Sequence, residues 1–570
     1  MKTLNINLKK IYKSLWTPVM IIPSLGLSLF VLFAVSYGYT GVFATQIASM
    51  NIFLLLLIPL ISVYFVHSTL DFEYSVISVT KLILCKYISV NIFCFSSVLI
   101  PIIVILILSS IYSVSYILVV SYILYIILSF LAQSLMLTAI GFAVAFLLKN
   151  KSAYVVSVMI SLIFSPFLQN FVNSLNNFFT ANSAFAATSN LLNISYGETF
   201  RVRFFGAGMP FNSETFLSWA AEVLFGLIIL CILLTAKRRT SLKNIIIPFA
   251  VGTVFTILFV ISIYAYYQSA PIIYDYTVRA ERAEKADEYV QDGSTVKVTD
   301  YNMELKLGSV LRNKCIIEIT DLDSDNITFK LDDCFDITNI TVNDNFVNYI
   351  RDGSYVSITG LPGSDMTVLF EYSGRLNYED LLHNKVNYSD CTSSYLSEIF
   401  AWYPKILSQS NNIDKRFTIN ITSNNTFVSN LNGNVLMDKG NSKISGTAAD
   451  IYIFSGYITS VEIDERNIII PLEFVNKKSS IEIVQREIDY MTNENASIYT
   501  DFLAPYPFAD NVNPTDEQIE EWQNSLKAAQ NEIDAVDTVL YIPMTYNIVG
   551  LSYIYGNTYI CCESILRGGW

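Results

Sequence analysis

Residues 245–264 read IIIPFAVGTVFTILFVISIY. A helix needs about 20 apolar residues to cross the hydrocarbon of a bilayer, and this stretch has that length without an ionised side chain. The composition of the chain also changes after this stretch. Residues 1–264 hold five acidic and fourteen basic residues, whereas the rest of the chain holds 44 acidic and 22 basic ones. An apolar half followed by an acidic half indicates a membrane part followed by a part in water.

Further apolar runs precede this one, so we expect an all-α membrane bundle of about seven transmembrane helices within residues 17–264. Glu222 is the one acidic residue inside a run, and we expect it to reach the interface or to line a cavity. The other six runs are Pro18–Tyr37, Asn51–Val66, Tyr87–Ile111, Ile117–Leu148, Ala153–Leu175 and Phe216–Ala236.

The basic residues of the membrane half predict its orientation. Twelve of the fourteen lie before the first run or after an even-numbered run, and the exceptions are Arg201 and Arg203. The positive-inside rule then places the N-terminus in the cytoplasm and everything after Tyr264 outside. We expect a multi-pass protein of the plasma membrane, with the lipid bilayer as a partner. Residues 1–16 are basic and amphipathic, which predicts an interfacial helix on the cytoplasmic leaflet.

The segment between the second and third runs has its own charge pattern. Asp71 and Glu73 open it, and Lys81 and Lys86 close it, which is the arrangement that a helix dipole favours. Two interpretations stay open: an ordinary capped cytoplasmic helix, or a helix on which a cytoplasmic partner docks.

The amphipathic N-terminal helix, the first six runs and this charged segment together resemble the permease subunit of type 2 ABC exporters, over roughly residues 1–240. The resemblance implies cytoplasmic ABC ATPase subunits and a second permease copy or a sister permease as partners. It also implies an outer gate in residues 169–213. No Gly-Lys-Ser/Thr occurs in the chain, so ATP would be bound by the partner subunit. The residues that the analogy assigns to ATPase coupling are Asp71, Phe72, Glu73, Tyr74 and Lys81, and those that it assigns to the gate or pathway are Glu222, Asn170 and Ser174.

The acidic half contains segments with different patterns of apolar and polar residues. Residues 265–293 are charged and predict a helical stalk. Residues 294–460 contain short alternating stretches such as Met303-Glu-Leu-Lys-Leu307, separated by turns, which predict a saddle- or sandwich-like antiparallel β domain with a few helices. The further strands that we expect are Cys315–Thr320, Asn326–Leu331, Ile340–Val342, Tyr355–Thr359, Met366–Tyr372, Arg416–Thr422, Asp450–Phe454 and Glu462–Pro471.

The order of several short elements in this half resembles the N-terminal part of aminopeptidase-N-like zinc metallopeptidases. The resemblance implies a saddle-shaped β domain, followed at residues 461–570 by a truncated, inactive α/β remainder of the peptidase domain. The elements are Tyr372-Ser-Gly374, Ala401-Trp402-Tyr403-Pro404, Phe417-Thr-Ile-Asn-Ile421, Phe454-Ser-Gly456-Tyr457 and Tyr506-Pro507-Phe508.

The chain departs from that family at the catalytic residues. Zinc peptidases of this kind need His-Glu-x-x-His, and the chain has only two histidines, His67 and His383. We therefore expect no catalytic residue, no metal site and no cofactor of its own. The acidic balance disfavours nucleic acid as a partner. Cys315 and Cys334 are the pair that we expect to bridge if any of the outer cysteines do.

The sequence thus favours an ABC exporter permease whose enzymatically dead outer domain receives or shields a substrate, for which a peptide is one candidate. The alternative is a membrane-anchored binding or sensing protein that transports nothing. An enzyme is disfavoured because the catalytic groups are missing.

Overall fold

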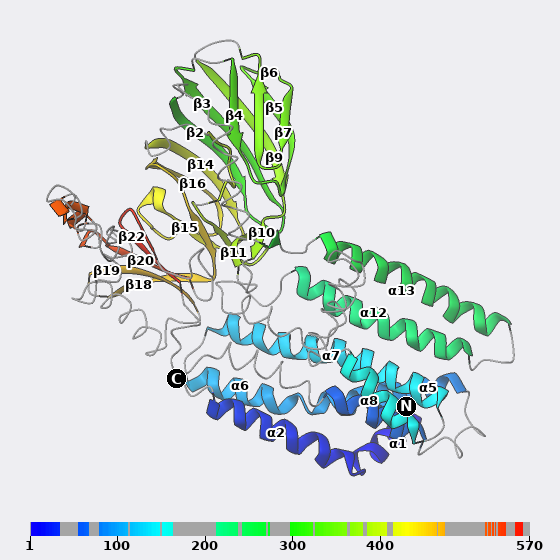
Figure 1. The fold of residues 1–570 in the computed structure, drawn as a ribbon. Helices are drawn as coiled ribbons and strands as arrows, with labels where there is room; N and C mark the ends of the chain where they lie inside the picture. Colours follow the sequence, from blue (N-terminus) through cyan, green and yellow to red (C-terminus); the bar gives the residue numbers. More distant parts are fainter. Residues whose placement is uncertain are drawn as a thin grey trace. The chain divides into compact units, whose positions relative to one another are not determined.

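A computed structural model gives the fold, and the chain divides between Ala270 and Pro271 into two compact units. Figure 1 draws both units, which are described separately below. The residues that the structure describes are 2–34, 55–67, 79–111, 115–148, 151–163, 213–236, 242–268, 272–273, 297–322, 325–361, 365–379, 385–398, 400–406, 414–463, 465–472, 534–542 and 553–562, with eight more between 519 and 531.

The first unit is helical. Four of its described stretches are long and apolar enough to cross a membrane: Lys81–Ile111, Tyr116–Leu147, Thr215–Ala236 and Ile246–Tyr266. Two shorter apolar helices, Leu55–His67 and Ser152–Leu162, accompany them. The labelled helices are α1 (Lys2–Tyr12), α2 (Trp16–Ala34), α5 (Val79–Ser96), α6 (Leu99–Ile111), α7 (Tyr116–Leu147), α8 (Ser152–Ile163), α12 (Ser213–Ala236) and α13 (Leu242–Gln268).

The third apolar run is longer than its composition predicted. We expected a span from Tyr87, with Lys81 and Lys86 outside it, but α5 already begins at Val79 and contains both lysines. Lys86 is only 2% exposed, and its ammonium group lies 5.9 Å from the centre of the Phe65 ring. A lysine is tolerated there because its stem is apolar and its charge can face an aromatic ring.

The break between α5 and α6 is caused by a proline. Pro101 has no backbone N–H, so it cannot donate the helical hydrogen bond to Ser97 O. That carbonyl oxygen instead accepts a 2.8 Å hydrogen bond from Ser24 Oγ on α2. The proline thereby frees a backbone acceptor that holds α2 against the break.

Helices α7 and α12 pack in parallel. Near one end the rings of Tyr125 and Trp219 are 5.6 Å apart, and further along both helices Gly226 faces Met136. A Cβ atom at Gly226 would lie 2.9 Å from the Met136 Cα atom, so the helices approach this closely only because the residue is glycine.

The helix Leu55–His67 also runs parallel to α7. Ser62 lies against Gly141, and His67 Nε2 lies 3.1 Å from Ala145 O. Residue numbers therefore increase in the same direction along both helices. By contrast, α5 is antiparallel to α7 and α13 is antiparallel to α12, as the contacts Tyr87–Phe142, Asn91–Thr138, Phe225–Phe259 and Cys231–Gly252 require.

The second unit is built from four sheets. Its seven-stranded sheet has the order β16-β14-β2-β3-β9-β5-β6 and carries most of the buried core. These strands are β16 (Gly440–Ala448), β14 (Lys415–Ser423), β2 (Lys297–Lys306), β3 (Leu311–Thr320), β9 (Met366–Gly374), β5 (Phe335–Val342) and β6 (Asn345–Phe346). A four-stranded sheet comprises β13 (Lys405–Ile406), β4 (Asn326–Lys330), β8 (Tyr355–Thr359) and β7 (Tyr349–Asp352).

Two further sheets complete this unit. The six-stranded one comprises β1 (Ile272–Ile273), β10 (Asn377–Glu379), β11 (Lys385–Ser389), β12 (Ser394–Leu396), β17 (Ile453–Gly456) and β15 (Thr426–Ser429). The five-stranded one comprises β18 (Ile458–Ile463), β19 (Arg466–Pro471), β20 (Thr538–Ile542), β22 (Thr558–Cys562) and β21 (Tyr553–Tyr555).

The β-rich prediction is confirmed, with three corrections of detail. The single strand expected at Glu462–Pro471 is a hairpin of β18 and β19, because Glu465 adopts a left-handed backbone with φ of 64°. Strands β14 and β2 pair in parallel, which a purely antiparallel sandwich does not contain. Within the predicted stalk, β1 is a strand that pairs with β10, and most of the remaining stalk lies outside the described residues.

Candidate functional site

Glu222 is buried in the helical unit. It lies on α12, seven residues after the start of the apolar stretch Thr215–Ala236, which corresponds to roughly 10 Å along the helix. The side chain is 0% exposed. Neither carboxylate oxygen has a hydrogen-bond partner among the described residues.

The helical period of α12 turns Glu222 toward α7. Trp219, three residues earlier, packs on Tyr125 of α7, and Gly226, four residues later, lies against the same helix. Residues at these spacings share one face of a helix. Phe216 adds a third ring, packed edge-on against Trp219 at 5.8 Å.

A carboxylate in this position is costly without a counterpart. An acidic side chain within apolar helices normally pairs with a cation or lines a polar pathway, and such residues mark functional sites in membrane bundles. The described basic residues of this unit lie in or next to α1 and α5, before α8 and at the start of α13, and none forms an ion pair with Glu222. The arrangement suits the binding of a positive charge.

The other predicted site residues of this half are not brought to Glu222. Lys81 lies in the first turn of α5 and is exposed. The remaining predicted coupling and gate residues lie outside the residues that the structure describes: Asp71, Phe72, Glu73, Tyr74, Asn170 and Ser174.

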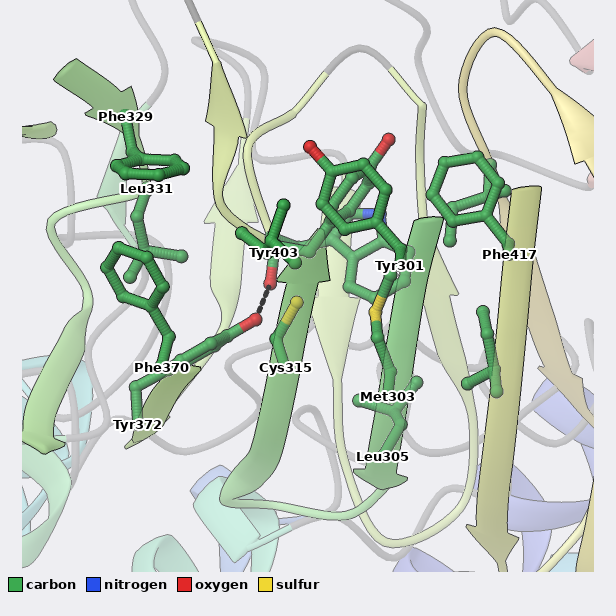
Figure 2. Close-up of a cluster of buried hydrophobic side chains, with 14 of the residues drawn as sticks. Tyr301, Met303, Leu305, Cys315, Phe329, Leu331, Phe370, Tyr372, Tyr403 and Phe417 are labelled. Atoms are coloured by element: carbon green, nitrogen blue, oxygen red, sulfur yellow. Dashed lines mark hydrogen bonds between the residues drawn. The ribbon is translucent and has the colours of Figure 1, made fainter. Parts of the chain in front are cut away.

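In the second unit, three of the short elements quoted from the sequence meet in one core cluster (Figure 2). Tyr372 OH donates a 2.9 Å hydrogen bond to Trp402 O, and Tyr301 OH donates one of 3.1 Å to Pro404 O. Tyr301 also stacks on Phe417, with ring centres 5.0 Å apart. Buried tyrosines of this kind each supply apolar area together with one directed hydrogen bond. The elements therefore hold the seven-stranded sheet to the segment that leads into β13.

Gly374 completes the first of these elements for a steric reason. A Cβ atom there would lie 2.2 Å from Cys334 O and 2.9 Å from the Phe335 Cα atom. Only glycine allows β5 to begin this close to β9.

The predicted bridge between Cys315 and Cys334 is wrong, since both thiols are free. Cys315 pairs with Phe370 on β9, whereas Phe335, the neighbour of Cys334, pairs with Gly374. Four residues along a strand span roughly 13 Å, which exceeds the Cα separation that a disulfide permits. Burial also raises the pKa of the Cys315 thiol well above its usual range, so this thiol stays protonated and inert.

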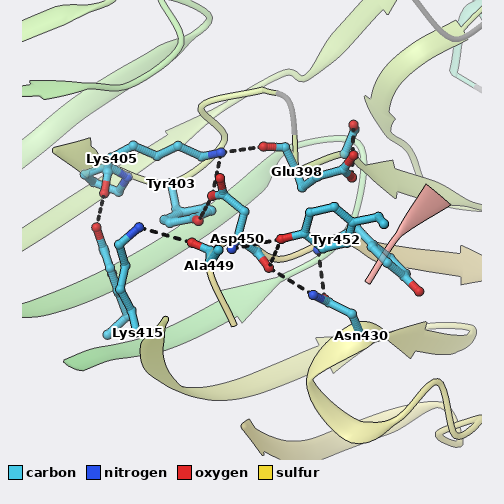
Figure 3. A network of polar contacts seen from close by, with 12 residues as sticks. Glu398, Tyr403, Lys405, Lys415, Asn430, Ala449, Asp450 and Tyr452 are labelled. Carbon is cyan, nitrogen blue, oxygen red and sulfur yellow. Dashed lines mark hydrogen bonds and ion pairs between the residues drawn. The ribbon is translucent and has the colours of Figure 1, made fainter. Parts of the chain in front are cut away.

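A polar network centred on Asp450 joins several parts of the second unit (Figure 3). Asp450 Oδ1 accepts a hydrogen bond from Tyr403 OH and forms a 2.8 Å ion pair with Lys405. The backbone of Asp450 donates a 2.9 Å hydrogen bond to Tyr555 OH and accepts one of 2.9 Å from Asn430. Because these partners come from β13 and the residues just before it, from β21 and from the turn after β15, we assign the network a structural role.

Neither site was fully visible in the sequence. Glu222 stood out as an acid in an apolar run, but its partner helix was unknown. The spacing of Trp219, Glu222 and Gly226 on one helical face was the signal that could have identified that face. The sequence predicts Asp450 as the first residue of a strand, but in the structure it precedes β17, and only the fold brings its partners to it. In the residues that the structure describes, no three or more His, Cys, Asp or Glu side chains are grouped so that they could hold a metal ion. His383 lies outside those residues.

The chain was compared with known proteins. No protein-family model matches it, and no curated protein does. Among solved structures it is similar to the M1 zinc metallopeptidase of Deinococcus radiodurans, with 11% identity, coverage of 48% of this chain and 61% of the peptidase, and a TM-score of 0.28. A mutant of that peptidase bound to a Tyr-Ser-Ala substrate gives 10% identity, 48% and 62% coverage, and a TM-score of 0.29. The chain thus spans about three fifths of the solved peptidases that it matches. The likeness is partial and distant.

Proposed function

We propose that the chain is the transmembrane permease subunit of an ATP-driven ABC exporter. ATP is bound and hydrolysed by separate cytoplasmic subunits, and the permease pairs with a second copy or a sister chain. The outer unit, peptidase-like in the order of its elements but not itself an enzyme, receives or shields the substrate, for which a peptide is one candidate.

The observation that carries the proposal is the buried Glu222. A chain that merely anchors an outer domain has no use for an uncompensated carboxylate between two apolar helices, because each such group disfavours insertion. A chain that passes a polar or charged substrate between its helices does have a use for it. The face shared by α7 and α12 is accordingly our candidate for part of the pathway.

The directions of the helices support seven crossings. The helix Leu55–His67, α7 and α12 are mutually parallel, while α5 and α13 oppose them. Successive crossings of a membrane must alternate in this way. Between the parallel helices α7 and α12 the chain must therefore cross once more. Helix α8 covers the first part of the apolar run Ala153–Leu175, which we assign to that crossing.

The proposal is tested by whether an ATPase accompanies the chain. Purification of the full chain from its host membrane should recover a stoichiometric ABC ATPase. Glu73→Lys should weaken that association, because loss of a hydrogen-bonded interface charge costs about 2–5 kcal/mol. Glu198→Lys, assigned to the opposite side of the membrane, is the control and should leave the association unchanged. Absence of any ATPase from the purified wild-type chain would contradict the exporter and favour a binding or sensing protein.

A further inference from the structure

We propose that Glu222 forms a binding site for a lipophilic organic cation, in which the positive charge lies between α7 and α12. The site itself rests on the geometry of these two helices. That the bound cation is the transported substrate rests on the proposed function.

The charge of the ligand follows from the charge of the site. Both oxygens of a fully buried carboxylate are without a hydrogen-bond donor in the described helices, and no described lysine or arginine pairs with them. An anionic or a neutral ligand would leave the carboxyl group without a charged partner. A cation stabilises the ionised form of the carboxyl group, because opposite charges attract strongly in an apolar surrounding.

The rings beside Glu222 favour the same ligand. Tyr125 and Trp219 pack together at 5.6 Å on the two helices, and Phe216 extends the aromatic surface. The faces of aromatic rings attract cations, tryptophan most strongly, and the attraction increases when the cation is desolvated. A carboxylate flanked by these rings therefore suits a cation that carries an apolar body.

Access requires a movement of α12. Glu222 and the ring of Trp219 are both buried against α7, so the ligand enters only when these ends of the helices separate. Gly226 and Met136 form the close contact one turn further on, which leaves the Tyr125–Trp219 end as the part that opens. Cation binding and the separation of α7 from α12 are thus coupled.

The probe is tetraphenylphosphonium, with tetraphenylborate as an anion of the same size and shape. Binding of each to the purified full chain in lipid nanodiscs is measured by equilibrium dialysis. We expect saturable binding of the phosphonium, weakened roughly tenfold or more by Glu222→Gln, as the loss of a desolvated charge partner implies. Glu222→Asp keeps the carboxylate and should retain part of the binding. Glu214→Gln, which removes the other acid of α12, should have no effect.

A second variant keeps the test decisive if Glu222→Gln does not fold. Trp219→Phe retains a ring with a weaker attraction for cations, so phosphonium binding should fall severalfold while borate binding stays the same. Equal phosphonium binding by the wild type and a folded Glu222→Gln variant would overturn the site, as would equal loss of both probes in Trp219→Phe. Cation binding by a chain that recruits no ATPase would refute the exporter and leave the site standing.

Discussion

Asp332 carries a buried carboxyl group, as Glu222 does, but it lies in the second unit, where its protonation can be followed. Its side chain is 7% exposed, and Oδ2 has no partner among the described residues. Burial raises the pKa of Asp332 to about 6, and the nearby Lys330 and Lys405 only partly oppose this effect. The folded state therefore holds this proton at pH values where the unfolded chain has released it.

The sign of the resulting pH dependence follows from that shift. A folded-state pKa above the unfolded value gives a stabilisation that is fully present below about pH 4 and is lost as the pH rises through about 6. The loss amounts to about 3 kcal/mol at most. Asp332→Asn should remove this loss of stability. The variant should therefore be more stable than the wild type at pH 7, and its unfolding midpoint in urea should change less between pH 4 and 7.

Asp336→Asn is the matched control, because Asp336 is exposed on β5 close by in the sequence. Its urea midpoint should follow that of the wild type at every pH. An Asp332→Asn variant with an unchanged pH slope, or with lower stability at pH 7, would contradict this account of the buried carboxylate.

At the scale of elements, α7 and α12 approach each other closely at Gly226, which has no side chain to separate them. The 2.9 Å separation of a hypothetical Cβ atom at Gly226 from the Met136 backbone leaves no room for a larger residue. Gly226→Leu should push α12 away from α7 and cost about 1–3 kcal/mol. The measurement is the thermal unfolding midpoint of the full chain in nanodiscs.

Gly26→Leu is the control for that experiment. Gly26 lies in the apolar helix α2, and a Cβ atom there would meet nothing within 4 Å. Its midpoint should stay at the wild-type value. Equal midpoints for both leucine variants would mean that α7 and α12 are not in contact at Gly226.

Element type was more predictable than element pairing. Apolar length alone identified the four long stretches of the helical unit, and the alternation in β2 and β3 identified two central strands, since their burial alternates as their composition does. Strand β16 was missed because it is rich in Gly, Ser, Asn and Thr, and only Ile444 is buried. A strand at the edge of a sheet that buries only one residue shows no alternation of apolar and polar residues in its sequence.

Contacts between distant segments could not be predicted at all. The parallel pairing of β14 with β2, the partners of Asp450 and the approach of α12 to α7 each join residues far apart in the chain. The Cys315–Cys334 prediction failed for the same reason, because proximity in sequence said nothing about the register on β9. The proposed cation site likewise needed the structure, which packs Tyr125 of α7 against Trp219, three residues before Glu222 on α12.

At the scale of the whole molecule, one chain joins a unit of apolar helices to an acidic β-rich unit, with the division near Ala270. The central proposal is that seven crossings place these β sheets on the opposite side of the membrane from residues 71–81, where we propose that the ATPase docks. An even number of crossings would put both on the same side. The outer unit could then neither receive nor shield an exported substrate.

Single cysteines introduced into a background that lacks the native ones decide between these arrangements. Replacements at Asn150 and Ser241 represent the cytoplasmic side, and one at the exposed Asn424, between β14 and β15, represents the outer unit. With a membrane-impermeant thiol reagent, we predict labelling at position 424 on intact cells, and labelling at 150 and 241 only after the cells are opened. Labelling of position 241 on intact cells, or protection of position 424, would contradict the account.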